Sequence, residues 1–193
     1  MTDPAKAATA TIADLLAIPE EHRHHEIIEG VLVEKEAASG KHGRAQLRLS
    51  RRLGPYDRRP GGRGPGGWWF ATEVEIQLAE TVVFRPDVAG WRLERLASPS
   101  DEVPITVRPD WVCEILSSNK RNDLIKKKRA YHHHQVGHYW IVDPTEQTLA
   151  VYRWHPDGYV EVLIADSTER VHAEPFEAVE LRVGALFDDD DDE

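Results

Sequence analysis

The sequence predicts an α/β fold in which helices flank a mixed β-sheet. The first observation is the apolar run WVCEIL at residues 111–116, which is typical of a buried central strand. The second is the helical spacing of apolar side chains in residues 41–54. The third is the pair of β-branched and aromatic runs in residues 148–165, which meet at the turn sequence Pro156-Asp157-Gly158. Helix and strand patterns therefore alternate along one chain.

The N-terminal segments predict a short helix followed by a strand. Thr11 is a suitable N-cap for a helix in residues 12–21, which Pro19 limits. Residues 24–36 have the β-branched, alternating character of a strand, and Gly30 within them indicates a turn or a bulge.

Residues 41–54 predict an amphipathic helix that is rich in arginine. Ala45, Leu49 and Leu53 recur at helical spacing, and a glycine closes the segment. Residues 54–67 follow as a loop in which glycine and proline dominate.

Residues 68–91 predict two further strands that form a hairpin around Ala79-Glu80. Apolar and polar side chains alternate within residues 68–80, so Glu73 and Glu75 are expected on the same face of one continuous strand.

The second half of the chain predicts a central strand, a helix and a β meander. After the strand at 111–116, a helix is expected to begin near Asn119 or Asn122 and to continue through three consecutive histidines. A proline ends the apolar strand at residues 138–144, and the hairpin at 148–165 follows it.

The charge of the chain is unevenly distributed. The formal net charge is −10, and residues 188–193, DDDDDE, carry six of these charges, which leaves the remaining chain near −4. A terminal acidic run is typical of a disordered tail, so we expect a single domain over residues 1–187 followed by this tail. The bulk charge gives no support for indiscriminate DNA binding, and any nucleic-acid surface has to be local.

Cysteine content and apolar patterning indicate the compartment. Cys113 is the one cysteine and lies inside the apolar run, which excludes an internal disulfide and fits a reducing cytoplasm. No apolar stretch approaches the length of a membrane span, and residues 1–16 lack the basic flank and long apolar block of a secretory signal. We expect a cytoplasmic protein without a membrane partner.

Two acids stand in or beside otherwise apolar strands. Glu114 lies inside the run at 111–116, and Asp87 follows Pro86, a residue that marks an edge or bend of a strand. Two carboxylates in one dry site repel each other and tend to bind a cation, for which oxygen ligands favour Mg²⁺ or Mn²⁺. The alternative is that each acid pairs separately with an arginine or a backbone N–H.

A lysine on the following helix adds to this pair of acids. If Leu124 and Tyr131 are packing positions, Lys127 lies three residues after the first and four before the second, and shares their inward stripe. Acids that hold an ion, beside an ammonium that orients water and phosphate, form the constellation of a metal-dependent nuclease.

These motifs together resemble those of a known family. RPDVA at residues 85–89, PDWVCEILSS at 109–118 and HYWIVDP at 138–144, with the helix between the last two, are similar to the Uma-type family of putative restriction endonucleases, within the PD-(D/E)XK nuclease superfamily. The resemblance extends from Thr11 to Phe187. It implies a restriction-endonuclease-like mixed β-sheet flanked by helices, with an added C-terminal β meander.

The resemblance also implies an activity and a set of site residues. It implies a metal-dependent endonuclease that hydrolyses the phosphodiester bonds of nucleic acid, with DNA as the expected substrate and Mg²⁺ or Mn²⁺ as the cofactor. Asp87 and Glu114 match the metal-binding acids, and the main-chain carbonyl of Ile115 would be a further ligand. Lys127 matches a catalytic lysine that has moved to the helix from its usual superfamily position, here Leu116.

Further expectations concern a histidine, a group of arginines and the oligomeric state. His42 matches a family position at the start of a helix, where it would be either a catalytic-site residue or a helix contact only. Arginines in and after residues 41–54 form the one local basic concentration, and would contact phosphates or else form a solvated face. These candidates are Arg44, Arg48, Arg51, Arg58 and Arg63. Many nucleases of this fold act as dimers, so a homodimer is expected.

Two alternatives from other classes stay open at this point. The chain could be a catalytically silent module that keeps a nuclease fold and binds DNA or a protein partner. The acids could instead form ion pairs at the interface of a structural homo-oligomer. The presence of Asp87, Glu114 and Lys127 together argues against simple decay, whereas the acidic body favours the silent module.

Overall fold

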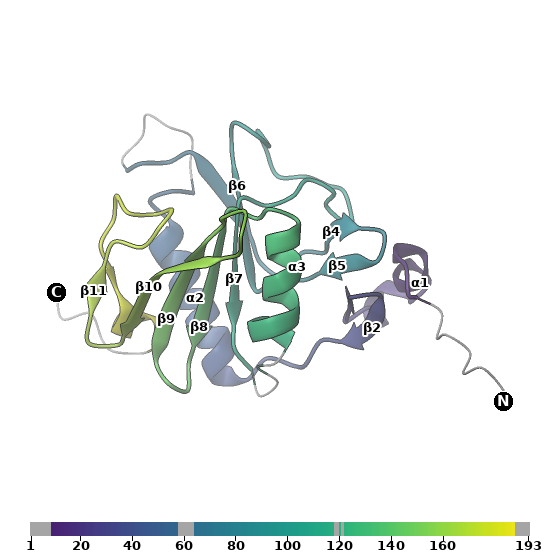
Figure 1. Ribbon diagram of the computed structural model, residues 1–193, viewed down its shortest axis with the longest axis horizontal. Coiled ribbons are helices and arrows are strands. Elements are labelled where there is room, and N and C mark those ends of the chain that lie inside the picture. The colour runs from purple at the N-terminus through teal and green to yellow at the C-terminus, as the bar shows by residue number, and fades with distance from the viewer. Residues whose placement is uncertain (1–8, 58–63, 118–119, 121, 188–193) are drawn as a thin grey trace.

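The computed structural model describes residues 9–57, 64–117, 120 and 122–187 (Figure 1). Its helical segments are α1 (Ile12–Leu16), η1 (Glu20–His22), α2 (Gly40–Leu53), η2 (Asn122–Lys127), α3 (Lys128–His133) and η3 (Val183–Leu186). Its strands are β1 (His25–Ile28), β2 (Val31–Glu34), β3 (Trp68–Ala71), β4 (Ile76–Ala79), β5 (Val82–Phe84), β6 (Val88–Arg92), β7 (Trp111–Ile115), β8 (His138–Asp143), β9 (Thr148–Arg153), β10 (Val160–Asp166), β11 (Arg170–Val171) and β12 (Leu181–Arg182). The predicted α/β class with a mixed sheet is confirmed.

The larger sheet has six strands in the order β10-β9-β8-β7-β6-β3. β7 and β8 are parallel, and every other neighbouring pair in this sheet is antiparallel. η2 and α3 connect the two parallel strands, because a parallel pair needs a crossover connection. β8, β9 and β10 form the expected C-terminal meander, which extends this same sheet.

Helices cover both faces of the six-stranded sheet. In Figure 1, α3 lies in front of the sheet and α2 behind it. Cys113 and Ile115 of β7 share one core cluster with Leu49 of α2, whereas Val112 shares the opposite cluster with Tyr131 of α3. Because side chains alternate along a strand, Glu114 points to the same side as Val112 and Tyr131, which is the α3 side.

A four-stranded antiparallel sheet in the order β2-β1-β5-β4 packs beside the larger one. Glu29 and Gly30, with φ angles of 52° and 74°, form the turn that joins β1 to β2. Positive φ at both central residues is the requirement of a type I′ hairpin turn, so the turn expected at Gly30 is confirmed. The expected hairpin of β4 and β5 is also confirmed, with Ala79 opposite Val82.

Within residues 68–91 the chain crosses twice between the two sheets, and this corrects the strands expected there. The segment 68–80 is two strands in different sheets rather than one, and so is the segment 81–91. Glu73 interrupts the first segment with a left-handed backbone at φ 57°. Pro86 lies in the second crossing, where its missing N–H removes a ladder hydrogen bond.

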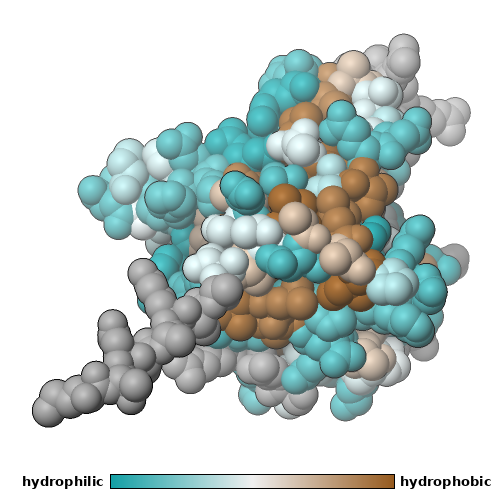
Figure 2. All heavy atoms as spheres, turned by 90° about the vertical axis from the view of Figure 1, so that its right-hand side faces the viewer, coloured by the Kyte–Doolittle hydropathy of each residue, from teal (hydrophilic) through white to brown (hydrophobic). Residues whose placement is uncertain are grey.

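The end of the molecule that carries α1 and β2 faces the viewer in Figure 2, and apolar side chains gather there on the surface. Leu16 of α1 and Val31 and Leu32 of β2 are exposed. Within the residues that the structure describes, none of the helices combines the length and apolar character needed to cross a membrane. The acidic tail expected at residues 188–193 lies outside the described residues.

Candidate functional site

The candidate site is a cavity of about 600 Å³ where residues of both larger sheets meet α2 and η2. Seven carboxylates line it, against the three basic side chains of Lys35, Arg85 and Lys127. The carboxylates are those of Glu26, Glu34, Glu36, Glu73, Asp87, Glu114 and Asp123. This excess of negative charge attracts a cation and repels a bare phosphate.

Asp87 lies at the crossing from β5 to β6, and its side chain is almost fully buried. Its Oδ1 lies 2.9 Å from Nζ of Lys35 and 3.2 Å from Nε2 of His42. Its Oδ2 accepts a hydrogen bond of 2.6 Å from the backbone N–H of Ile115. Burial raises the pKa of Asp87, but the contacts with His42, Lys35 and the Ile115 N–H outweigh burial and hold this pKa well below its usual range. Asp87 is therefore a carboxylate at neutral pH.

Glu114 lies in β7, and its side chain faces η2 and α3. Its Oε1 accepts a hydrogen bond of 2.9 Å from the hydroxyl of Tyr131 and lies 3.3 Å from Nζ of Lys127. Burial raises the pKa of Glu114 well above its ordinary value, and the charges of Asp123 and Asp87 act in the same direction, against the opposing effect of Lys127. A cation bound nearby would act in the same direction as Lys127 and lower the pKa of Glu114.

Lys127 connects three of the cavity carboxylates. Its Nζ lies 3.0 Å from Oε1 of Glu26, 3.3 Å from Oε1 of Glu114 and 3.3 Å from Oδ1 of Asp123. Burial lowers the pKa of this ammonium, but the three carboxylates raise it well above its ordinary value. Lys127 therefore stays charged beside Glu114, and it faces inward as its spacing from Tyr131 predicts.

The packing role expected for Leu124 is wrong, because its side chain is 41% exposed whereas Tyr131 is fully buried. The reason is the local helix type. Residues Asn122–Lys127 form a π-helix, whose hydrogen bonds join residues five apart, so the α-helical spacing used to place Leu124 does not apply there. The π turn instead buries Asp123 and Lys127 toward the cavity.

Lys35 and Glu73 belong to the site, although the sequence did not indicate either of them. Nζ of Lys35, just after β2, lies 2.7 Å from Oε2 of Glu73 and donates a hydrogen bond of 2.7 Å to the carbonyl of Arg85. Burial lowers the pKa of Lys35, but the charges of Asp87 and Glu114 raise it above its ordinary value. Lys35 stands between two acids in the sequence, which is a common surface pattern. The alternation of apolar and polar residues in 68–80 predicted that Glu73 lies on a solvent-exposed face.

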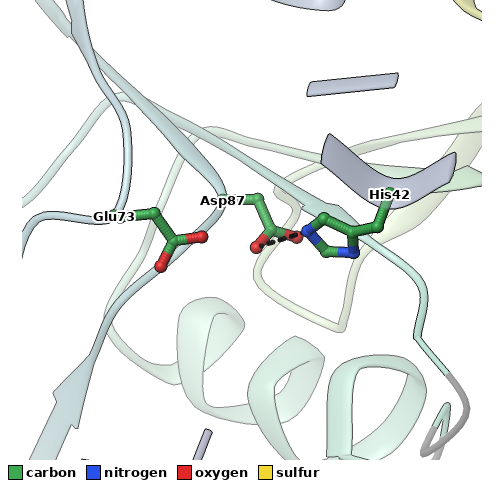
Figure 3. Close-up of side chains that lie close together, drawn as sticks. All are labelled: His42, Glu73 and Asp87. Carbon is green, nitrogen blue, oxygen red and sulfur yellow. Dashed lines mark ion pairs between the residues drawn. The ribbon is translucent and has the colours of Figure 1, made fainter. Parts of the chain in front are cut away.

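His42 lies in the first turn of α2, and its side chain points toward Asp87 (Figure 3). Ser39 is the N-cap of this helix, and its side chain accepts a hydrogen bond of 3.2 Å from the backbone N–H of His42. His42 is 5% exposed. Ala45 and Leu49, which are buried in the core, fix the orientation of the helix and so direct His42 into the cavity.

One group of side chains in this cavity fits a divalent cation. His42, Glu73 and Asp87 each offer a ligand atom, and these three atoms lie within 4.8 Å of one another. Carboxylate oxygens suit Mg²⁺ and Mn²⁺, and an imidazole nitrogen suits transition metals. Glu114 and Ile115, the other predicted ligands, line the same cavity. The residues present therefore fit the metal that the sequence predicts.

The predicted arginine contacts lie elsewhere. Arg44, Arg48 and Arg51 are on α2 and do not line the cavity. Nη1 of Arg48 donates a hydrogen bond of 3.4 Å to the carbonyl of Ala185, so part of this side chain faces the protein. Arg58 and Arg63 lie outside the described residues. A role of these arginines in phosphate contacts stays a prediction.

Comparisons with known proteins identify what this chain is similar to. The model of the Uma2 family, described as "Putative restriction endonuclease", matches residues 12–184. A crystal structure described as a putative nuclease belonging to DUF820, from Anabaena variabilis, superimposes with a TM-score of 0.70 at 22% sequence identity. That alignment covers 92% of this chain and 97% of the other. No curated protein matches the chain.

Proposed function

Because this chain belongs to the Uma2 family, which is described as a family of putative restriction endonucleases, we propose that it is a metal-dependent endonuclease that hydrolyses the phosphodiester bonds of nucleic acid, with DNA as the expected substrate. One observation carries the proposal. Asp87, Glu114 and Lys127 come from a sheet crossing, a strand and a helical turn, and all three line one cavity. Acids beside a charged lysine are the parts that phosphoryl transfer requires.

Asp87, Glu114 and the main-chain carbonyl of Ile115 would hold a Mg²⁺ or Mn²⁺ ion. Such an ion, when bound, polarises a phosphoryl oxygen and lowers the pKa of a bound water. The excess of carboxylates in the cavity supports a requirement for a metal ion, because a phosphodiester would otherwise meet net negative charge. The low pKa of Asp87 supports it as well, since the ligand is already ionised at neutral pH.

In the proposed hydrolysis, a water oxygen forms a bond to phosphorus and the bond from phosphorus to the leaving oxygen breaks. The water loses a proton and the leaving oxygen gains one, which yields a phosphate monoester end and a hydroxyl end. Lys127 places a positive charge where negative charge develops on the phosphoryl oxygens. Tyr131 and Lys127 hold Glu114 in position through contacts of 2.9 and 3.3 Å.

Cleavage assays with a divalent-ion screen test this proposal. Supercoiled plasmid and labelled single strands are incubated with Mg²⁺, Mn²⁺ or a chelator. We expect cleavage with one of these ions, none with the chelator, and a loss of about 100-fold or more for Asp87→Asn, Glu114→Gln and Lys127→Met. Asp143→Asn is the matched control, because Asp143 is a buried acid that does not line the cavity.

Unchanged cleavage by Asp87→Asn would overturn the assignment of the site. If the protein binds DNA but no ion supports cleavage, the catalytically silent module becomes the correct account. A duplex presents two strands to cut, so the proposal includes a homodimer with two active sites. The proposal also places the protein in the cytoplasm. Light scattering of the full chain, with and without a DNA duplex, measures the oligomeric state.

A further inference from the structure

We propose that His42, Glu73 and Asp87 form a divalent-cation site of mixed nitrogen and oxygen ligands, and that Lys35 fills this site as an internal cation until a metal ion displaces it. The inference deepens the proposed nuclease function, and rests on it only for the use that the protein makes of the ion. It assigns a donor set that includes an imidazole, and it gives Lys35 a role in metal binding.

Three ligand groups from distant parts of the chain converge in the cavity. His42 comes from the first turn of α2, Glu73 from the crossing between β3 and β4, and Asp87 from the crossing between β5 and β6. Their ligand atoms lie within 4.8 Å of one another, and Figure 3 shows the three side chains directed toward one region. Glu73 reaches this region from a left-handed backbone at φ 57°, a conformation that a non-glycine residue adopts at a cost.

The surroundings of His42 independently favour a ligand at its ring. Only 5% of this residue is exposed, and neither ring nitrogen has a hydrogen-bond partner among the residues that the structure describes. Nε2 lies 3.2 Å from Oδ1 of Asp87, within ion-pair distance but without hydrogen-bond geometry. Buried polar groups are nearly always satisfied, so a buried imidazole in this state is suited to bind a ligand that protein atoms do not supply.

The ammonium group of Lys35 lies between the oxygen ligands of this site. Its Nζ lies 2.7 Å from Oε2 of Glu73, 2.9 Å from Oδ1 of Asp87 and 2.7 Å from the carbonyl oxygen of Arg85. These three acceptors match the three donors of an ammonium group. Lys35 therefore neutralises the same two carboxylates that a metal ion would use, and a metal ion and the ammonium compete for Oδ1 of Asp87.

Lys35 can leave this position without disrupting the core. It follows β2, which is an edge strand of the four-stranded sheet, and its side chain is 19% exposed. The cavity that it lines has a volume of about 600 Å³, which leaves room for a flexible four-carbon stem to move aside. Lys127, by contrast, is 3% exposed and held by three carboxylates, so it is not the displaceable cation.

The donor set determines which ion is preferred. Both Mg²⁺ and Mn²⁺ take oxygen ligands, but Mg²⁺ retains its waters, whereas Mn²⁺ is a first-row transition metal and accepts an imidazole nitrogen more readily than Mg²⁺ does. His42 should therefore make the site bind Mn²⁺ more tightly than Mg²⁺. If carboxylates and a carbonyl alone held the ion, replacement of His42 would leave the ratio of the Mn²⁺ and Mg²⁺ affinities unchanged.

Isothermal titration calorimetry of the chelator-treated full chain, without nucleic acid, tests the proposal. We expect Mn²⁺ to bind more tightly than Mg²⁺. We expect His42→Asn to weaken Mn²⁺ binding by about 10–100-fold or more and to reduce the preference over Mg²⁺, since even loss of a group that supports a ligand has that effect. Glu73→Gln should weaken both ions, and Lys35→Met should tighten both. Glu75→Gln is the matched control, because Glu75 pairs with Arg23 and does not line the cavity.

Pulsed electron paramagnetic resonance of the Mn²⁺-loaded wild-type protein adds a test that needs no variant. Modulation from a coordinated ¹⁴N nucleus is expected, and its absence from a bound Mn²⁺ ion would overturn the assignment of His42. Weaker binding in a folded Lys35→Met variant would overturn the displacement role of Lys35. These outcomes are distinct from failure of the nuclease proposal, because a protein that binds Mn²⁺ through His42 but cuts no nucleic acid keeps this site and loses that function.

Discussion

At the residue scale, Lys127 is the charge that allows three carboxylates to be buried together. Glu26, Glu114 and Asp123 each place an oxygen 3.0–3.3 Å from its Nζ. A buried ion-pair group contributes less than its Coulomb energy suggests, because both partners lose hydration. Removal of one partner has a different effect, since it leaves the remaining charges uncompensated.

The variant Lys127→Met should therefore destabilise the fold as well as abolish the proposed activity. We expect a decrease of about 3–5 kcal/mol in the free energy of unfolding, measured by urea denaturation at neutral pH. Lys126→Met is the control, because this neighbouring lysine is only half-buried and does not line the cavity. Equal stability of Lys127→Met and the wild type would show that the three carboxylates do not depend on this ammonium.

Asp143, at the end of β8, supports a prediction about pH. Its Oδ2 lies 2.6 Å from Nζ of Lys120, and its Oδ1 accepts hydrogen bonds from the backbone N–H groups of Thr145 and Glu146. Burial raises the pKa of Asp143, but the hydrogen bonds from Lys120 and from the two backbone N–H groups outweigh burial and lower this pKa below its ordinary value. The carboxylate therefore stabilises the fold above the unfolded pKa, near about pH 4, and this contribution is lost as pH falls through the folded pKa.

Thermal unfolding of Asp143→Asn at pH 7 and at pH 3 measures this contribution. The melting temperature of the variant should be below that of the wild type at pH 7, and the difference should shrink at pH 3. A difference that is constant between the two pH values would show that charge on Asp143 is not its cause.

Part of the site could be predicted at this scale, and part could not. Asp87 and Glu114 stand out because an acid in an apolar strand requires a partner, and the structure places both in the cavity. Lys35 and Glu73 carry no such signal, since each lies among acids in a segment that resembles a solvated surface. Their place in the site depends on the chain crossing between two sheets, which local pattern does not encode.

At the scale of elements, α2 positions His42 through its N-terminal cap. Ser39 accepts a hydrogen bond from the backbone N–H of His42, and Ala45 and Leu49 anchor the helix in the core. A cap satisfies one of the N–H groups that the first turn of a helix leaves without a partner. The orientation of the imidazole therefore depends on a hydroxyl three residues earlier.

The variant Ser39→Ala should destabilise the protein by about 0.5–2 kcal/mol through loss of this cap. Ser50→Ala is the matched control in the same helix, because the Ser50 hydroxyl donates to the carbonyl of Gln46 within the helix and caps no N–H group. Chemical denaturation measures the change in the free energy of unfolding for both variants. Equal effects of the two substitutions would argue against a capping role for Ser39.

Two glycines in different elements support a paired prediction. A Cβ at Gly90 of β6 would lie 2.8 Å from Cε1 of Phe70 and 3.2 Å from Cε3 of Trp111, whereas a Cβ at Gly43 of α2 would meet nothing within 4 Å. Gly90→Ala should therefore cost about 1–3 kcal/mol of stability through overpacking. Gly43→Ala should add about 0.5–1 kcal/mol, because alanine favours a helix. Denaturation curves in which the two variants shift in the same direction would contradict this.

Element boundaries were predictable where a local signal defines them. The hairpin turn at Gly30 and the extent of α2 follow from turn and helix patterns. The break after β3 was not predictable, because residues 68–80 alternate as a continuous strand would. The π turn at Asn122–Lys127 was missed for a related reason, since its apolar pattern was interpreted with α-helical spacing.

At the scale of the whole molecule, the site exists because two sheets and two helical layers meet at one cavity. The six-stranded sheet contributes Glu114, the four-stranded sheet contributes Glu26, and the crossings between the sheets contribute Glu73 and Asp87. A solved structure that superimposes with a TM-score of 0.70 shares the fold, which is the arrangement of the sheets and helices. The predicted homodimer stays a prediction.

Anomalous X-ray scattering from crystals of the full chain grown with Mn²⁺ tests the central claim most directly, because it locates the ion itself. We predict one peak in the acidic cavity within bonding distance of an oxygen atom of Asp87. A second data set from Asp87→Asn crystals should lack that peak. The claim would be contradicted if a protein that still cleaves DNA held a well-ordered ion elsewhere and gave no anomalous signal in the cavity.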